Sequence, residues 1–166
     1  EFLLFWILGN ENVYGVACNA NKNPDSFFKF VNEAALLIKS KDKNHPVAIA
    51  SGDLVYLDRF AKYCPDVDIF GTNAYRGNYG FGNLWQALKD ESGKAAFITE
   101  YGCPAYAQGM SLQEAEEAQA LYHRGAWEDI VLNTSVNSSS GMCGKGVALG
   151  LGAGNSIGGV VFEFID

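Results

Sequence analysis

The sequence has few basic residues and no long apolar run, and each shortage excludes a class of protein. Its 12 Lys and Arg stand against 19 Asp and Glu, which gives a net charge of −7. Nucleic acids and anionic membrane surfaces both require a basic face. The longest apolar run, Phe2 to Leu8, is far shorter than the ~20 residues of a membrane span. We therefore expect neither a nucleic-acid partner nor a membrane span.

The motifs of metal and redox sites are also missing. The sequence has 2 histidines, His45 and His123, which lie far apart, and no pair of cysteines has the C-x-x-C spacing of zinc or redox sites. We expect no metal ion and no cofactor. The cysteines are expected to be buried thiols, or to include a disulfide such as Cys103–Cys143 if the protein is exported. They are Cys18, Cys64, Cys103 and Cys143.

The rest of the composition is that of a globular protein rich in aromatic residues. Hydrophobic residues make up 48% of the chain and charged residues 19%, a balance that argues against disorder. Aromatic residues reach 13%, which suits the faces of sugar rings and equally suits an ordinary core.

Short apolar runs alternate along the chain with amphipathic segments. A helix is predicted where apolar residues recur at spacings of three and four, and another where Ser111 and Glu114 form a capping box. Asp53 is expected to cap a third helix. The predicted strands are 2–8, 47–50, 68–73, 95–99 and 160–166, and the predicted helices are 25–38, 54–63, a segment from 83, and 111–132, with 133–159 as a loop.

This alternation predicts an α/β fold with parallel strands and right-handed crossovers. An open doubly wound sheet and part of a (β/α)8 barrel both fit the pattern. A complete barrel takes about 250 residues, and this chain has 166. Because the first and last residues both fall in predicted strands, we expect a fragment of a longer barrel.

Polar residues follow each predicted strand, at the end where barrel enzymes place their active sites. Glu11 and Glu100 are the notable ones, because neither stands directly before a predicted helix. Glycoside cleavage requires one carboxylic acid and one carboxylate across the scissile bond. A separation of about 5–5.5 Å indicates retention of configuration, and about 6.5–9.5 Å indicates inversion. The two glutamates are therefore the candidate catalytic pair.

Four segments resemble, in order, the strand signatures of the clan A glycoside hydrolases. Residues 9–12 (GNEN) resemble strand four, 68–75 (DIFGTNAY) strand six, 97–102 (FITEYG) strand seven and 158–164 (GGVVFEF) strand eight. The likeness is closest to the barrel domain of glycoside hydrolase family 2 and its bacterial relatives, with some likeness to the β-1,3-glucanosyltransferases of family 72. It implies that residues 1–166 are one partial catalytic barrel domain, strands four to eight, without the first three strands.

The resemblance also implies roles for individual residues. Glu11 would be the general acid and then the general base, and Glu100 the nucleophile of a retaining enzyme. Asn10 would bond the sugar 2-hydroxyl, and Tyr75 would orient Glu100. Phe164 stands where relatives usually have tryptophan.

Three further residues are supporting candidates with open alternatives. Asn73 and Arg76 would either line a sugar subsite or serve the structure. Glu163 would face either the site or the outer helices, because neighbouring strand residues alternate in direction.

Three functions fit these features. The first is hydrolysis of β-linked glycosides or glucans through a covalent glycosyl-enzyme. The second is transglycosylation by the same two glutamates, and the third is a non-catalytic carbohydrate-binding barrel. The expected partner is an oligo- or polysaccharide, and an open half-barrel would also be prone to self-association. The compartment stays open: a glycan-active enzyme suits an extracellular or periplasmic location, and residues 1–8 lack a signal-peptide pattern.

Overall fold

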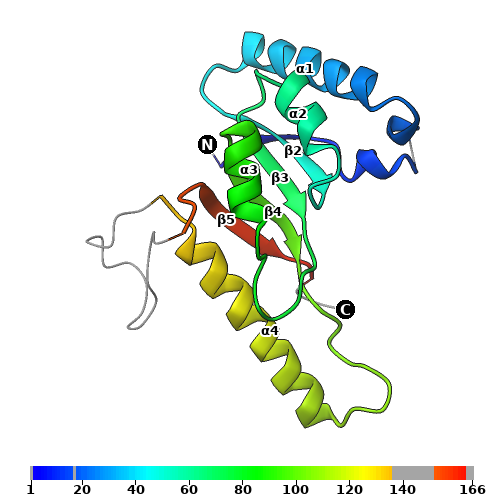
Figure 1. The fold of residues 1–166 in the computed structure, drawn as a ribbon, viewed down its shortest axis with the longest axis vertical. Coiled ribbons are helices and arrows are strands. Elements are labelled where there is room, and N and C mark those ends of the chain that lie inside the picture. Colours follow the sequence, from blue (N-terminus) through cyan, green and yellow to red (C-terminus); the bar gives the residue numbers. More distant parts are fainter. Residues whose placement is uncertain (1, 17, 136–151, 164–166) are drawn as a thin grey trace.

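The chain folds into a five-stranded parallel sheet with helices between the strands (Figure 1). A computed structural model describes residues 2–16, 18–135 and 152–163. The strands follow the order β1-β2-β3-β4-β5 without a crossover. They are β1 (Trp6–Leu8), β2 (Val47–Gly52), β3 (Ile69–Asn73), β4 (Ala95–Tyr101) and β5 (Ser156–Val161). The helices are η1 (Asn12–Tyr14), η2 (Ala20–Lys22), α1 (Pro24–Lys41), α2 (Leu57–Tyr63), α3 (Leu84–Ser92) and α4 (Leu112–Leu132).

The two longest helices begin at strong capping signals. Asn23 accepts a hydrogen bond from the backbone N–H of Ser26 at 3.2 Å, and Pro24 occupies the first turn of α1. At α4, Ser111 and Glu114 form the reciprocal pair of a capping box. The start of α4 agrees with the predicted one, whereas α1 is capped by Asn23 and begins at Pro24, before the predicted start at 25.

The sheet is strongly curved, as a contact between a side chain of β4 and a residue next to β1 shows. Phe5, which directly precedes β1, packs edge-on against Phe97 of β4 with ring centroids 5.2 Å apart. Three strand spacings separate β1 from β4, about 14 Å in a flat sheet. Gly71 of β3 allows close packing there, since a side chain would run into the carbonyl oxygen of Ile49 and the methyl of Thr99. The curvature is that of part of a barrel wall.

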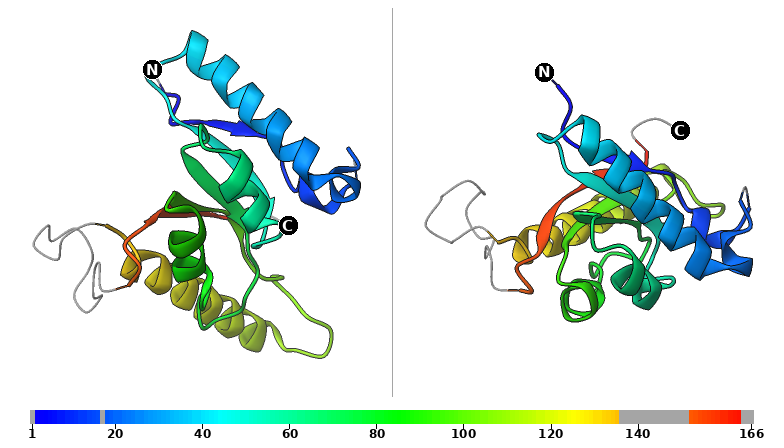
Figure 2. Two further views of the ribbon diagram at one scale, coloured as in Figure 1. Left: turned by 45° about the horizontal axis from the view of Figure 1, so that its top comes forward. Right: turned by 90° about the horizontal axis from the view of Figure 1, so that it is seen from above.

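A row of phenylalanine rings joins the outer helices to the sheet. Phe28 of α1 packs against Phe60 of α2, and Phe60 packs against Phe70 of β3, with ring centroids 6.3 Å and 4.8 Å apart. All three rings are fully buried. Helices α1, α2 and α3 follow one another along the sheet, and α4 lies beside β5 (Figure 2). The strand ends are therefore fixed to a packed helical layer.

The predicted fold class is confirmed, but several boundaries were wrong. The predicted strand 2–8 shortens to β1, and Phe2 and Leu4 are exposed although we expected a buried strand. Strand β5 begins at Ser156, inside the predicted loop. Cys18 is exposed rather than buried. Phe164 and Cys143 lie outside the described residues.

Two other features concern the described residues as a whole. No helix in this part of the chain combines the length and the apolar character needed to cross a lipid bilayer. The same residues contain no group of three or more His, Cys, Asp or Glu side chains arranged to hold a metal ion.

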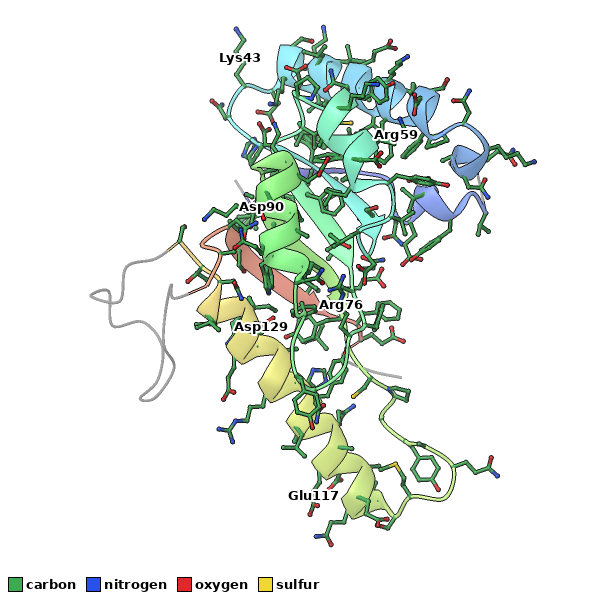
Figure 3. The ribbon with its side chains drawn as sticks, viewed as in Figure 1. Lys43, Arg59, Arg76, Asp90, Glu117 and Asp129 are labelled. Carbon is green, nitrogen blue, oxygen red and sulfur yellow. The ribbon has the colours of Figure 1, made fainter. Side chains whose placement is uncertain are left out.

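Asp129 of α4 joins three segments of the chain by hydrogen bonds (Figure 3). One of its carboxylate oxygens accepts hydrogen bonds from the backbone N–H of Phe81 at 2.7 Å and from the indole N–H of Trp85 at 2.8 Å. The other accepts from the side-chain amide of Asn133 at 3.1 Å. Because Trp85 is only 1% exposed, its indole donor depends on this carboxylate.

We expect Asp129→Ala to lower the free energy of unfolding by about 2–3 kcal/mol, because it leaves buried donors without an acceptor. The control is Asp90→Ala on α3, an exposed carboxylate bonded to Gln86 alone at 2.7 Å, which should cost within about 0.5 kcal/mol. Urea unfolding measures both. Equal losses in the two variants would contradict the role of Asp129.

Candidate active site

The candidate residues gather at the carboxyl edge of the sheet, as predicted. Asn10 and Glu11 follow β1, and Asn73 is the last residue of β3. Glu100 is the penultimate residue of β4. Because all the strands are parallel, these residues share one edge of the sheet, where barrel enzymes carry their chemistry.

The side chain of Asn73 is the centre of this edge. Its Nδ2 donates to Asn10 Oδ1 at 3.0 Å and to Glu11 Oε1 at 3.1 Å, while its Oδ1 accepts from the hydroxyl of Thr99 at 2.6 Å. Asn73 is 3% exposed, so these bonds replace water that cannot reach it. Asn73 thus fixes Asn10 and Glu11 relative to β4, and its contact with a sugar stays a prediction.

Glu11 has a left-handed backbone, with φ at 50°. A residue other than glycine adopts this region at a cost of about 1–3 kcal/mol, and such residues concentrate at functional sites. Its backbone N–H donates to the carbonyl of Ala50 at 2.9 Å, which holds the turn against β2. The strained turn directs the Glu11 side chain to Asn73.

A register shift between β3 and β4 sets the position of Glu100. Thr72 pairs with Ile98, but the next residue, Asn73, pairs with Glu100, so Thr99 is an extra residue on β4. A bulge of this kind re-aims the side chains beside it. Thr99 then reaches Asn73, and Glu100 accepts a hydrogen bond from the Tyr75 hydroxyl at 2.7 Å.

Tyr75 connects the two glutamates electrostatically. Its pKa is raised by burial first, then by the hydrogen bond and charge of Glu100, and further by the charge of Glu11. A tyrosine held protonated in this way donates its hydrogen bond to an ionised carboxylate. Both glutamates therefore act on the same phenol, and Tyr75 occupies its predicted place beside Glu100.

Arg76 forms an ion pair with Asp53, and its role in a sugar subsite stays a prediction. Its Nε donates to Asp53 Oδ2 at 2.9 Å, and its Nη2 also pairs with Asp53. Its Nη1 donates to the Phe81 carbonyl at 2.6 Å and to Asn83 Oδ1 at 3.0 Å. Asp53 is accordingly not the simple helix cap that we expected: α2 starts only at Leu57. The pair joins the end of β2 to the loop after β3.

The backbone of Asp53 extends this link to the centre of the site. Its N–H donates to the carbonyl of Asn73 at 2.9 Å, and its carbonyl accepts from the hydroxyl of Thr72 at 2.7 Å. The ion pair of Asp53 and Arg76 therefore holds the chain on both sides of Asn73 and Tyr75.

Tyr122 of α4 supports the two loops that follow β3 and β4. Burial raises the pKa of Tyr122, and the nearby backbone N–H groups of Gly102 and Gly77 act in the opposite direction. Gly102 also lies directly against the carbonyl of Phe162, which leaves no room for a side chain there. The loops that border the site therefore meet at one buried phenol.

Glu163 lies at the end of β5, exposed, and lines a cavity of about 520 Å³ together with Tyr75. The structure therefore places Glu163 on the side of the site, not under the helices. Phe164, the other candidate on this strand, lies outside the described residues.

Sequence reasoning missed three residues of this edge: Thr99, Asp53 in its ion pair, and Tyr14. The ring of Tyr14 lies over Gly52, and its pKa is raised by burial and by the charges of Glu11 and Asp53. Tyr14 follows Glu11 by three residues, and that spacing within a short turn was the available signal. The bulge that brings Thr99 to Asn73 has no comparable sequence signal.

Two solved structures with a similar fold are a β-glucuronidase and an endo-β-1,4-mannanase. A β-glucuronidase from Bacteroides uniformis matches 97% of this chain with a TM-score of 0.62 and 17% identity. An endo-β-1,4-mannanase from Thermotoga petrophila matches 96% with a TM-score of 0.56 and 19% identity. The chain spans only 19% and 34% of those two proteins. No protein-family model and no curated protein sequence matches the chain.

At these identities the likeness establishes the fold. The chain is an α/β structure in which parallel strands alternate with helices, as in part of a TIM barrel. The predicted class is thereby confirmed, whereas the chemistry has to be argued from the site.

The pKa of the Asp53 carboxyl is held below its ordinary value of 3.8, first by the hydrogen bonds from Arg76. A lowered pKa in the folded state contributes stability that is present above pH ~4 and disappears as the pH falls through the lowered value. We expect Asp53→Asn to unfold at lower urea concentration than the parent at pH 7. This difference should shrink below pH 4.

Arg76→Gln is the matched variant, because it removes the cation and leaves the carboxyl. Its deficit should also shrink below pH 4, and adding Asp53→Asn to it should cost little more, since the two residues act as a pair. A deficit that stays constant from pH 7 to pH 3 would show that the ion pair is not its cause.

Proposed function

We propose that this chain is the carboxyl-terminal part of the catalytic barrel of a retaining glycoside hydrolase that acts on β-linked sugars. The observation that carries the proposal is the placement of Glu11 and Glu100 at one sheet edge, where Asn73 bonds Glu11 and Thr99, and Tyr75 bonds Glu100. In this proposal residues 1–166 are one partial domain, strands four to eight, as in families 2 and 72.

Each carboxylate has a separate task in this mechanism. Glu100, held by Tyr75, attacks the anomeric carbon, while Glu11 gives its proton to the departing glycosidic oxygen. The bond to the leaving group breaks as the covalent glycosyl-enzyme forms. Glu11, now a carboxylate, takes a proton from water, and that water displaces Glu100 from the sugar. The starting anomeric configuration is restored.

Asn10 and Asn73 arrange the surroundings of this pair. Because Asn73 Nδ2 donates to Asn10 Oδ1, the amide NH2 of Asn10 is turned away from Asn73. This geometry supports the assignment of Asn10 as the donor to a sugar 2-hydroxyl. Asn73 serves as a positioning residue for Glu11.

The two glutamates should respond differently to the leaving group. In the full-length protein, Glu100→Gln should lose turnover of all aryl β-glycosides, because no other group forms the covalent intermediate. Glu11→Gln should lose about 10²–10⁴-fold with a poor leaving group, and much less with dinitrophenol, which departs without a proton. Initial rates with both aglycones measure this difference.

Glu116→Gln, at an exposed position on α4, is the control and should match the parent enzyme. Nuclear magnetic resonance of the first product anomer tests retention. Turnover near the parental level in Glu100→Gln would refute the nucleophile assignment, and an inverted first product would refute the covalent mechanism.

Tyr75→Phe should reduce kcat/KM by about 10- to 100-fold, because a hydrogen bond to a charged group contributes about 1.5–3 kcal/mol. The loss should appear mainly in kcat, since Tyr75 acts on the nucleophile. Tyr79→Phe, in the same loop and 93% exposed, is the matched control. An unchanged kcat in Tyr75→Phe would exclude this role.

The other two functions predicted from the sequence give different outcomes in the same assays. A transglycosylase would transfer the sugar from Glu100 to an added oligosaccharide, and product analysis with and without acceptor detects this. A non-catalytic barrel would bind sugars without turnover in either case.

A further inference from the structure

A second feature of the carboxyl edge is a cavity next to Tyr75, whose lining bears on the choice of substrate. It has a volume of about 520 Å³ and is lined by Tyr75, residues 102–106 of the loop after β4, Phe162 and Glu163. Tyr75 lines the cavity and also donates a hydrogen bond to Glu100 at 2.7 Å. Tyr75 therefore links the cavity to the proposed nucleophile.

The position of the cavity in the sheet assigns it to one side of the substrate. Glu11 follows β1, Glu100 lies in β4, and the cavity lies at the ends of β4 and β5. The acid protonates the leaving oxygen, so the leaving group is on the side of Glu11. The cavity lies at the other end of the strand order, so we assign it to the sugar that becomes covalently attached.

The lining of the cavity combines rings with one carboxylate. The exposed fractions of Tyr75, Tyr106 and Phe162 are 50%, 59% and 51%, so each ring offers an apolar surface to the cavity. Sugar-sized ligands bind in such sites through apolar contact plus a few polar groups that fix orientation. Here the polar groups are phenol hydroxyls and the Glu163 carboxylate, and no described lining residue is Lys, Arg or His.

The nearest arginine in the sequence is already occupied. Arg76 follows Tyr75, but all three of its guanidinium nitrogens are engaged, by Asp53, the Phe81 carbonyl and Asn83. Asp53 neutralises its charge and fixes its direction. An anionic sugar in the cavity would find no cation there, and would face the carboxylates of Glu100 and Glu163.

From this geometry we infer that the cavity is a subsite for an uncharged sugar ring, with Glu163 as the residue that excludes acidic sugars. The inference rests on the proposed function and specifies its substrate class. The Glu163 carboxylate accepts hydrogen bonds from sugar hydroxyls, which are strong because the acceptor is charged. The same carboxylate repels a uronate. The fold shared with a β-glucuronidase thus does not extend to its substrate.

The test compares sugars that differ in charge alone. In the full-length protein, aryl β-glycosides with one common aglycone should be cleaved at least about 100-fold faster in kcat/KM for the best neutral hexoside than for the matching uronide. Glu163→Gln should narrow this ratio about tenfold, mainly by improving the uronide. Tyr106→Ala should raise KM for the neutral hexoside several-fold.

Two controls separate this inference from general damage. Tyr79→Ala removes an exposed ring outside the cavity, and Glu117→Gln removes an exposed carboxylate on α4; both should keep the parental ratio. Changing only the aglycone should leave the effect of Glu163→Gln unchanged, since the cavity is assigned to the other side.

The two levels of the proposal fail in different ways. Preferred cleavage of the uronide, with Glu100→Gln still inactive, would overturn the subsite and leave the hydrolase intact. Undiminished turnover in Glu100→Gln would overturn the hydrolase itself. If no aryl glycoside is cleaved, saturation-transfer magnetic resonance measures whether the protein binds a methyl β-hexoside or the matching uronate. Binding of the uronate, or of neither sugar, overturns the subsite.

Discussion

The arrangement of the carboxyl edge depends on one buried amide. Asn73 holds its partners by hydrogen bonds that water cannot replace, because its side chain is almost completely inaccessible. An amide is suited to this place, since it is able to donate and accept hydrogen bonds at the same time. Asn73 donates to Asn10 and Glu11 and accepts from Thr99. An aspartate at this position could only accept, and it would add a charge next to Glu11.

Contacts farther from the centre of the site hold Asn73 in position. The ion pair of Asp53 and Arg76 fixes the strand ends around it, and the bulge in β4 supplies Thr99 at the required point. The positive φ of Glu11 is a conformation that the turn alone would not favour. It is maintained because the backbone bond to Ala50 and the side-chain bond to Asn73 both hold it. The strained backbone of Glu11 and the fixed side chain of Asn73 are thus parts of one arrangement.

Sequence reasoning predicted the fold correctly and selected the two glutamates, whose catalytic roles stay predictions, because both steps depend on local patterns. Alternating apolar segments and the capping box of α4 have clear signatures, and Glu11 and Glu100 stand at strand ends without a helix to cap. The partnership of Arg76 with Asp53 was not predictable in this way, since it joins residues from different strands and depends on the register of the sheet. The same holds for Thr99: whether it faces Asn73 depends on a one-residue bulge. The exposed β1 also differed from expectation, because apolar composition does not tell whether a strand has neighbours on both sides.

Tyr122 lies next to two of the loops that follow the strands, because the backbone N–H groups of Gly77 and Gly102 both influence the pKa of its hydroxyl. The segment beyond Gly102 extends away from the sheet before α4 begins (Figure 1). Substitutions in residues 104–106 would therefore alter the walls of the cavity beside Tyr75 while the strand ends stay in place. In the proposed hydrolase, the choice of sugar would then be able to change during evolution by substitutions in one loop, without any change in the two glutamates.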